Sequence, residues 1–189
     1  MKRRISTALL ILALTAAVTV SAQAASLFPP TAVYNGQFTD IRTGDWFYKN
    51  VVSFSSLGLT NGKNSLSTFS PHSDMTIAEG ITLAARLRSL YEFGSAESGP
   101  DRFRTPQAVW YEPYVTYLQT AGGIASEFDG RWNVSATRAE TAHIFAHALP
   151  AELFTPINAD AVNIGYAVGR YIKDVTEYTP YQQDILTMY

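Results

Sequence analysis

Two histidines on one predicted helix are the residues of this chain whose types and spacing most directly suggest chemistry. The stretch ATRAETAHIFAHAL, residues 136–149, holds His143 and His147 four positions apart, with Glu140 three positions before the first of them. At about 100° per residue these three side chains fall on one face of a helix, opposite an apolar face. Imidazoles at i and i+4 can bind zinc, so a secreted metal-dependent hydrolase that uses this face is one hypothesis for the function.

The alternative is that this polar face is solvated or packs between neighbouring structural units. A zinc metalloprotease places a glutamate between its two histidines, as His-Glu-x-x-His, where it acts as general base. Here the residue after His143 is Ile144, and the one other histidine of the chain, His72, falls in a predicted loop. No nucleophile–base pair or glycine-rich phosphate loop is present elsewhere. We therefore expect no catalytic residue, no metal and no cofactor.

The start of the chain has the pattern of a secretory signal peptide. The basic residues of MKRR are followed by the uncharged run ALLILALTAAVTV over residues 8–20 and then by Ala22-Gln23-Ala24. These features predict a signal peptide over residues 1–24, cleaved after Ala24, and a protein secreted to the cell surface or cell wall. The apolar run is short for a membrane span, which needs about 20 residues; an uncleaved anchor is the alternative.

Composition restricts the partners that the chain is expected to bind. Loss of the signal peptide leaves 11 of the 14 basic residues against 16 acidic ones, and a mildly acidic chain without a basic cluster is a poor nucleic-acid binder. The chain has no cysteine, so disulfides cannot staple the fold, which must rest on a hydrophobic core or on association. Aromatic residues make up 13% of the chain, which suits both a packed core and contacts with sugars.

Two segments of the chain resemble each other. WFYKNVVSFSSLGL begins at Trp46 and WYEPYVTYLQTAGGI begins at Trp110, 64 positions later, and each ends a helical apolar pattern at a glycine, Gly58 or Gly122. Glycine has no Cβ and therefore readily takes the left-handed conformation that often ends a helix. Each segment predicts a short helix. A tryptophan that opens such a helix is most often buried, so we expect both tryptophans in the core, with partial exposure to a groove as the alternative.

Each segment is followed by a second matching element. Thr76-x-x-Glu79 and Thr137-x-x-Glu140 both have the pattern of a capping box, with the two glutamates 61 positions apart. In a capping box the threonine hydroxyl accepts from the backbone N–H three residues on, and the glutamate accepts from the threonine N–H. The pattern therefore predicts that each unit is a helix, a loop and a second helix.

A third unit begins near the end of the chain. The segment IKDV over residues 172–175 echoes FTDI over 38–41, and YQQDILTMY over 181–189 resembles another first helix. We predict an all-α fold of tandem helix-loop-helix repeats. Its segments are a signal peptide (1–24), an N-terminal segment (25–37), repeat 1 (38–92), a linker (93–109), repeat 2 (110–150), a linker (151–171) and the start of a truncated repeat 3 (172–189).

These motifs, in this order, resemble the S-layer homology (SLH) domain, whose second helix opens on Ile-Thr-Arg-Ala-Glu. The signature stands here as Met75-Thr76-Ile77-Ala78-Glu79 and Ala136-Thr137-Arg138-Ala139-Glu140. The resemblance covers two repeats and part of a third. It implies a partial pseudo-threefold bundle whose inter-repeat grooves bind a cell-wall polysaccharide or a peptidoglycan-linked polymer, often one bearing pyruvate ketals. The chain would then anchor non-covalently to the wall.

The resemblance also implies which residues bind the polymer. An arginine fork can hold a ketal carboxylate bidentately, and an aromatic face can lie against sugar C–H groups. The glutamates are expected to fix their loops rather than to contact ligand. Ile77 stands where the family has arginine, so Arg138 is the main expected anion contact. The full expected set is Arg138, Trp110, Trp46, Glu140, Glu79, Thr137 and Thr76.

A third hypothesis is a structural surface-layer subunit that self-associates, because two repeats and part of a third would complete a three-sided bundle as a homo-oligomer. On any of these hypotheses we expect no nucleic-acid partner, and no membrane partner once the signal peptide is cleaved.

Overall fold

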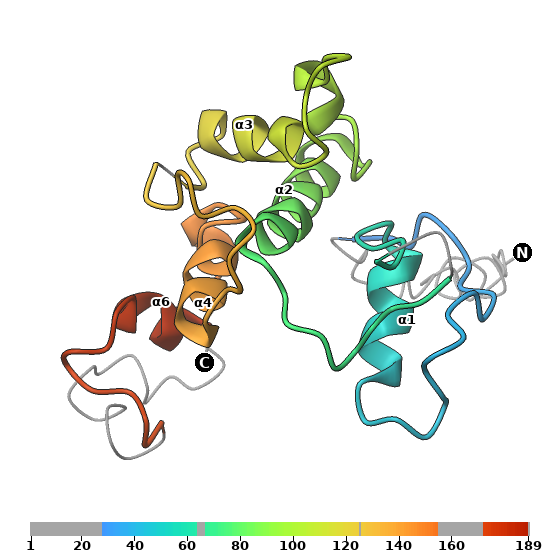
Figure 1. Ribbon diagram of the computed structural model, residues 1–189, viewed down its shortest axis with the longest axis horizontal. Coiled ribbons are helices and arrows are strands. Elements are labelled where there is room, and N and C mark those ends of the chain that lie inside the picture. Colours follow the sequence, from blue (N-terminus) through green and yellow to red (C-terminus); the bar gives the residue numbers. More distant parts are fainter. Residues whose placement is uncertain (1–27, 64–66, 125, 155–171, 189) are drawn as a thin grey trace, which may run out of the picture.

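A computed structural model of the chain describes residues 28–63, 67–124, 126–154 and 172–188 (Figure 1). The predicted signal peptide, over residues 1–24, and most of the predicted second linker lie outside the described residues. Within the described ranges the elements are helical, without a β-strand, so the all-α prediction is confirmed. They are α1 (Tyr48–Ser56), α2 (Ile77–Phe93), the 3-10 turn η2 (Pro100–Phe103), α3 (Glu112–Thr120), α4 (Arg138–Ala146), the 3-10 turn η3 (Ala151–Leu153) and α6 (Gln182–Thr187).

Both predicted capping boxes are present, at the starts of α2 and α4. Thr76 Oγ1 accepts from Glu79 N at 3.3 Å, and Glu79 Oε2 accepts from Thr76 N at 2.7 Å. The corresponding distances between Thr137 and Glu140 are 3.2 and 2.8 Å. Each box satisfies two backbone donors that a helix start otherwise leaves unpaired, which fixes where the second helix of each unit begins.

Both predicted glycine stops are also confirmed. Gly58, after α1, and Gly122, after α3, each have a φ of 73°. The N–H of Gly58 donates to Ser55 O, and the next N–H along the chain donates back to Phe54 O. Gly122 and its successor make the same pair of bonds to the end of α3. This double closure is the Schellman motif, and it turns the chain sharply out of each first helix.

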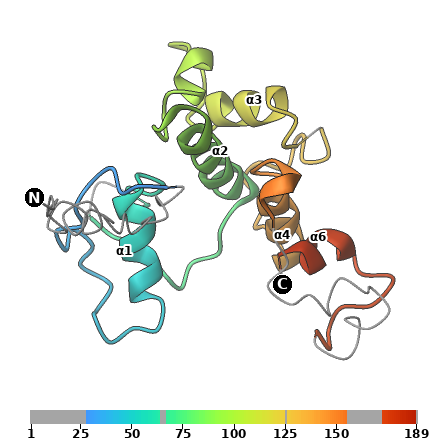
Figure 2. The same cartoon turned by 180° about the vertical axis from the view of Figure 1, so that it is seen from behind.

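The core is built around α2, against which α3 and α4 both pack (Figures 1 and 2). Burying a large apolar side chain stabilises the fold by about 1.5–3 kcal/mol, and several are fully buried here. The largest are Phe128, Ile77, Ile81, Leu118 and Ile144.

The loop that leads into α4 covers the start of α2. The N–H of Ile77 donates to Val134 O at 2.9 Å, and the N–H of Ala78 donates to Trp132 O at 2.9 Å. These are the first two backbone donors of α2, which the capping threonine does not reach. The start of α2 is therefore completed by residues that come more than fifty positions later in the chain.

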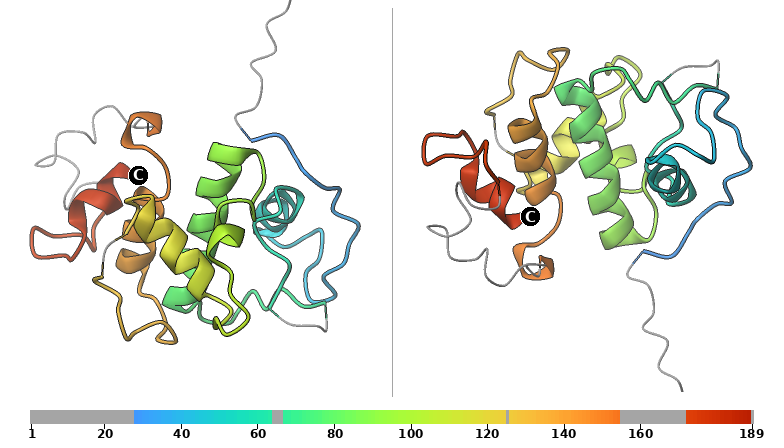
Figure 3. Two further views of the ribbon diagram at one scale, coloured as in Figure 1. Left: turned by 90° about the horizontal axis from the view of Figure 1, so that it is seen from above. Right: turned by 90° about the horizontal axis from the view of Figure 1, so that it is seen from below.

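Helix α1 has a small aromatic core of its own, on the side of α2 away from α4 and α6 (Figure 3). Phe38, Ile41 and Val51 are its buried members. Asp40 closes the loop beside this core, because its carboxylate accepts from Phe69 N at 2.8 Å and from Ser70 N at 2.6 Å. Burial opposes the charge on Asp40, but these bonds outweigh it and hold the pKa of Asp40 below its ordinary value.

Neighbouring units meet in the same order along the chain. Helix α2, of predicted repeat 1, packs against α3, of predicted repeat 2, and α4 packs against α6. The pseudo-threefold bundle remains a prediction. Among the described residues, no helix is both long enough and apolar enough to span a bilayer.

Candidate functional site

A groove with a volume of about 660 Å³ lies where the predicted first and second repeats meet. One wall consists of residues 60–63 and of residues between 69 and 75, and the floor is the outer face of α2. The opposite side consists of Arg104, which follows η2, together with Trp110 and Tyr114 at the start of α3. Ligand pockets typically have volumes of about 300–1,000 Å³, so this groove is large enough for a short stretch of a polymer.

Arg86 organises the groove from within. Its side chain is only 15% exposed. Its Nη1 donates to Leu59 O at 3.1 Å, its Nε donates to Glu97 Oε1 at 2.8 Å, and its Nη2 donates to the Tyr114 hydroxyl at 3.1 Å. That hydroxyl in turn donates to Glu97 Oε2 at 2.7 Å. One guanidinium thus joins the turn after α1, the linker and α3.

Two more cations line the groove, and both are more exposed than Arg86. Arg104 pairs with Asp101 at 2.9 Å and with Glu97 at 3.3 Å. Lys63 Nζ donates to a loop carbonyl and lies 3.3 Å from Glu79 Oε1. Exposed ion pairs of this kind contribute only about 0–1 kcal/mol. These cations can therefore exchange a protein carboxylate for a carboxylate on a ligand at little cost.

Thr82, on the groove side of α2, carries a buried polar group without a partner among the described residues. The residue is 6% exposed, and its hydroxyl has no hydrogen-bond partner among the described residues. Thr82 lines the groove from the middle of α2. A buried polar atom without a partner costs about 1–3 kcal/mol. The hydroxyl oxygen itself is buried, so it lies beneath the surface of the groove.

The two tryptophans are not in the core, and that prediction was wrong. Trp46 is 88% exposed and Trp110 is 54% exposed. Each stands edge-on against the next aromatic residue, Phe47 at 5.5 Å or Tyr111 at 5.4 Å between ring centroids. The second aromatic of each pair is the one that turns inward, which leaves the tryptophan outside. Trp110 lies on the groove, whereas Trp46 does not line it.

The capping residues lie at two different places. Thr76 and Glu79 form the box at the start of α2, and Glu79 also lines the groove. Thr137 and Glu140 form the box at the start of α4, where Arg131 Nη2 donates to Glu140 Oε1 at 2.6 Å. Burial opposes the charge on Glu140, but the bonds from the Thr137 backbone and from Arg131 outweigh it, so the pKa of Glu140 lies below its ordinary value.

Arg138 lies outside the 660 Å³ groove. Its side chain is 97% exposed, and its nearest carboxylate, on Asp174, is 3.9 Å away. It borders a shallower hollow of about 300 Å³ that also includes Phe145 of α4 and Met188 beyond the end of α6. The expected anion contact and the larger groove are therefore on different junctions between units.

Most of the residues that line the groove were not predicted from the sequence. Glu79, Thr82 and Arg86 stand at i, i+3 and i+7 of α2, a polar stripe on a helix whose other faces are largely buried. This spacing can be read from the sequence alone, and it indicates a helix face that contacts polar groups. Arg104 and Tyr114 reach the same place only through the fold.

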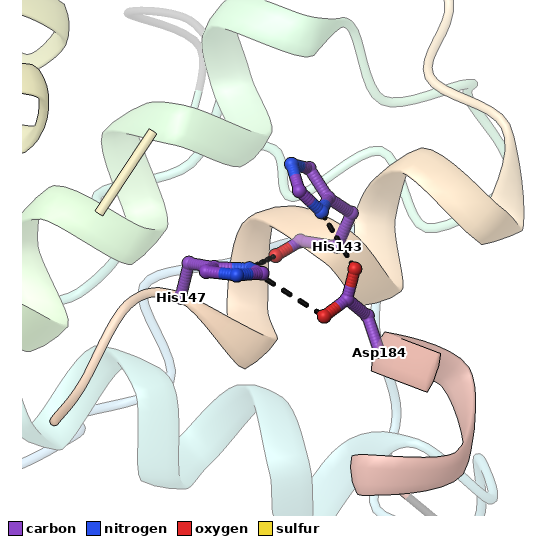
Figure 4. A group of neighbouring side chains, drawn as sticks. All are labelled: His143, His147 and Asp184. Carbon is purple, nitrogen blue, oxygen red and sulfur yellow. Dashed lines mark hydrogen bonds and ion pairs between the residues drawn. The ribbon is translucent and has the colours of Figure 1, made fainter. Parts of the chain in front are cut away.

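The predicted trio of Glu140, His143 and His147 does not assemble. Glu140 is held by the cap and by Arg131, at the start of α4. The two histidines meet Asp184 of α6 instead (Figure 4). His143 lies between units, as one of the two interpretations predicted, and its side chain is 15% exposed.

Comparison of the chain with models of known protein families, with curated proteins and with solved structures finds no match. The function is therefore inferred from the chain's own residues and geometry.

Proposed function

We propose that this chain is a non-enzymatic anchoring module that binds an acidic cell-wall polysaccharide in the groove between its first and second repeats. The observation that carries the proposal is the groove itself, a hollow of about 660 Å³ at a junction between units. It combines the exposed aromatic face of Trp110 with two exposed cations, Arg104 and Lys63, whose carboxylate partners can be exchanged. This set of groups suits a sugar polymer that carries carboxylates.

Each group has a distinct part in binding. The exposed ring of Trp110 offers an apolar platform for the C–H face of a sugar, and such rings retain a polar edge that tolerates water. Arg104 can hold a carboxylate such as that of a pyruvate ketal through two parallel N–H bonds. The SLH resemblance of the signature sequences supports the same class of ligand.

Arg138 is proposed as a second contact, in the hollow between α4 and α6. Its guanidinium is almost fully exposed, so an anion there gains little from burial and binds more weakly than in the groove. We therefore assign the main affinity to the groove and a supporting contribution to Arg138.

The test is sedimentation of the chain with purified cell walls that carry pyruvylated polysaccharide, before and after removal of the pyruvyl groups. Trp110→Ala is expected to weaken binding about tenfold, which corresponds to about 1.4 kcal/mol of lost contact. Trp46→Ala is the matched control, because its ring is also exposed but lies off the groove. Arg104→Gln is expected to remove the preference for pyruvylated walls.

Two outcomes would contradict the proposal. If Trp110→Ala binds as well as Trp46→Ala, the groove is not the binding site. If the unaltered chain binds both wall preparations equally, the ligand is not recognised by its carboxylates. Arg138→Gln in the same assay measures the contribution of the second hollow.

The other two hypotheses predict different behaviour. A hydrolase built on Glu140 needs that carboxylate as a base, but it accepts three hydrogen bonds within the cap and from Arg131. A self-associating surface-layer subunit would elute as an oligomer in size-exclusion chromatography, whereas an anchoring module that works alone would elute as a monomer.

A further inference from the structure

Two imidazoles of α4 and one carboxylate of α6 converge at the junction between these helices (Figure 4). His143 Nδ1 lies 2.7 Å from Asp184 Oδ2, and His147 Nδ1 lies 3.7 Å from Asp184 Oδ1. The ligand-type atoms of the three residues all lie within 4.8 Å of one another. Two imidazoles and one carboxylate thus come together from distant parts of the chain, with His143 and Asp184 separated by 41 positions.

The His143 ring is held in place from several sides. It stacks on Tyr181 at 4.2 Å between ring centroids, and it packs near Phe128. Tyr181 has a φ of 57°, a conformation that a non-glycine residue adopts at some cost. The His143 ring is therefore positioned before any ligand arrives. The side chain of His147, at the end of α4, is 42% exposed, which leaves one side of the cluster open to water.

A second carboxylate holds the far nitrogen of the same ring. Glu127 Oε1 lies 3.0 Å from His143 Nε2. In metal sites the nitrogen of a histidine that does not bind the ion usually donates to a carboxylate or a carbonyl, which fixes the tautomer and strengthens the ligand. Glu127 stands in that position if Nδ1 is the ligand atom.

The charges around the cluster favour a cation. With both rings neutral, Asp184 and Glu127 contribute two negative charges. The nearby Arg131 pairs with Glu140, at 2.6 Å. Tyr181 adds a neutral hydroxyl, whose pKa is raised by burial and by the neighbouring carboxylates.

We propose that His143, His147 and Asp184 form a binding site for a divalent transition-metal ion of the zinc class, which fastens α6 to α4. Zinc takes nitrogen and carboxylate ligands at about 2.0–2.2 Å in a tetrahedron, so its ligand atoms lie roughly 3.3 Å apart. His143 Nδ1 lies 2.7 Å from Asp184 Oδ2 and His147 Nδ1 lies 3.7 Å from Asp184 Oδ1, on either side of that value, so binding through one oxygen requires the carboxylate to turn. Water completes the shell on the open side, and His147 exchanges its bond to the His143 carbonyl for the ion.

The site is structural rather than hydrolytic. Its three ligands come from two helices that the ion would join, and Glu140, which a hydrolase would need as base, is committed to the cap of α4. Two imidazoles with one carboxylate also select zinc-like ions over calcium or magnesium, which prefer a full shell of oxygen ligands.

The first test is calorimetric titration of the untagged full chain with zinc chloride at neutral pH, with calcium chloride as a comparison. One site with a dissociation constant on the order of micromolar is expected for zinc, with a rise in thermal midpoint and no binding of calcium. Asp184→Asn and His147→Gln should each weaken zinc binding at least about tenfold.

Matched controls come from the same chain. His72→Gln removes the histidine that lies in a loop of repeat 1, and Asp174→Asn removes an exposed carboxylate near α4; both should bind zinc as the unaltered chain does. Circular dichroism checks that each variant is folded, and His147→Gln provides a replacement at a half-exposed position if Asp184→Asn unfolds.

Cobalt gives an independent readout. Co²⁺ in a tetrahedral site has visible absorption that is much stronger than that of the hydrated ion, and this absorption should disappear in His147→Gln. Absence of zinc binding, or equal zinc affinity in Asp184→Asn and Asp174→Asn, would overturn the proposal. The cluster would then be a set of side-chain contacts that joins α6 to α4 without an ion.

Discussion

The two junctions between successive units use the same helix positions for different purposes. Thr82 and His143 each lie six residues beyond the capping threonine of their helix, and Arg86 and His147 each lie ten beyond it. At the first junction these positions border an open groove. At the second they hold two imidazoles that meet a carboxylate.

The partner helices show the same correspondence. Tyr114 of α3 and Asp184 of α6 each lie three residues beyond the aromatic residue that precedes the helix. The Tyr114 hydroxyl accepts a hydrogen bond from the Arg86 guanidinium, whereas the Asp184 carboxylate lies against the rings of His143 and His147. A permanently charged arginine closes the first junction, and two imidazoles with a carboxylate close the second. One scaffold therefore supports two joints that are built from different groups.

Removal of Arg86 should cause the largest loss of stability. Arg86→Met leaves Glu97, the Leu59 carbonyl and the Tyr114 hydroxyl without their shared donor, and the free energy of unfolding should fall by about 2–3 kcal/mol. Urea denaturation measures the change. Arg104→Met removes a half-exposed arginine that pairs with the same carboxylate, Glu97. It should lower the free energy of unfolding by less than about 1 kcal/mol. Equal losses in the two variants would show that the buried guanidinium has no special part in the first junction.

The second junction should be weaker than the first when no metal is present. In a chelating buffer, His143→Gln should lower the free energy of unfolding by about 1–2 kcal/mol, because glutamine cannot bond to Asp184 and Glu127 together. His72→Gln serves as the control and should change it little. A loss larger than that of Arg86→Met would reverse the proposed ranking of the two joints.

The smallest expected effect is the contribution of Glu140 to the dependence of stability on acidic pH. The folded-state pKa of Glu140 lies below its ordinary value of 4.5. Its ionised form therefore contributes stability above about pH 4.5, and this contribution disappears as the pH falls through the folded-state pKa. Glu140→Gln should be less stable at neutral pH by up to about 1 kcal/mol and should match the unaltered chain in strong acid.

Thermal midpoints measured from neutral to strongly acidic pH decide this prediction. Glu152→Gln, an exposed position in η3, is the control. Parallel curves for Glu140→Gln and the unaltered chain would mean that the bonds to Glu140 do not favour its ionised form.

The features that the sequence predicted correctly are local ones. The capping boxes at Thr76 and Thr137 and the left-handed glycines at 58 and 122 depend on residues within a few positions of each other, so the short-range pattern determines them. They also locate the second helices, and with them the all-α class. The helix-loop-helix units follow from these signals, but their arrangement in a bundle does not.

The candidate sites were predicted poorly because they depend on long-range contacts. The sequence could not indicate which aromatic of Trp110-Tyr111 faces inward, since both fit the same helical pattern. Asp184 joins His143 only because α6 packs on α4, across 41 positions. Arg86 was overlooked because its partners come from a turn, a linker and another helix, none of which is adjacent to it in the chain.

The backbone bonds from the start of α2 to Val134 and Trp132 limit how modular this protein can be. A fragment that ended in the linker over residues 93–109 would lose both acceptors, and the opening turn of its longest helix would fray. The two predicted repeats are thus joined through the backbone as well as through their side chains. Designs that transplant the groove should carry the chain through residue 136, because a cut between the repeats removes part of the framework that supports it.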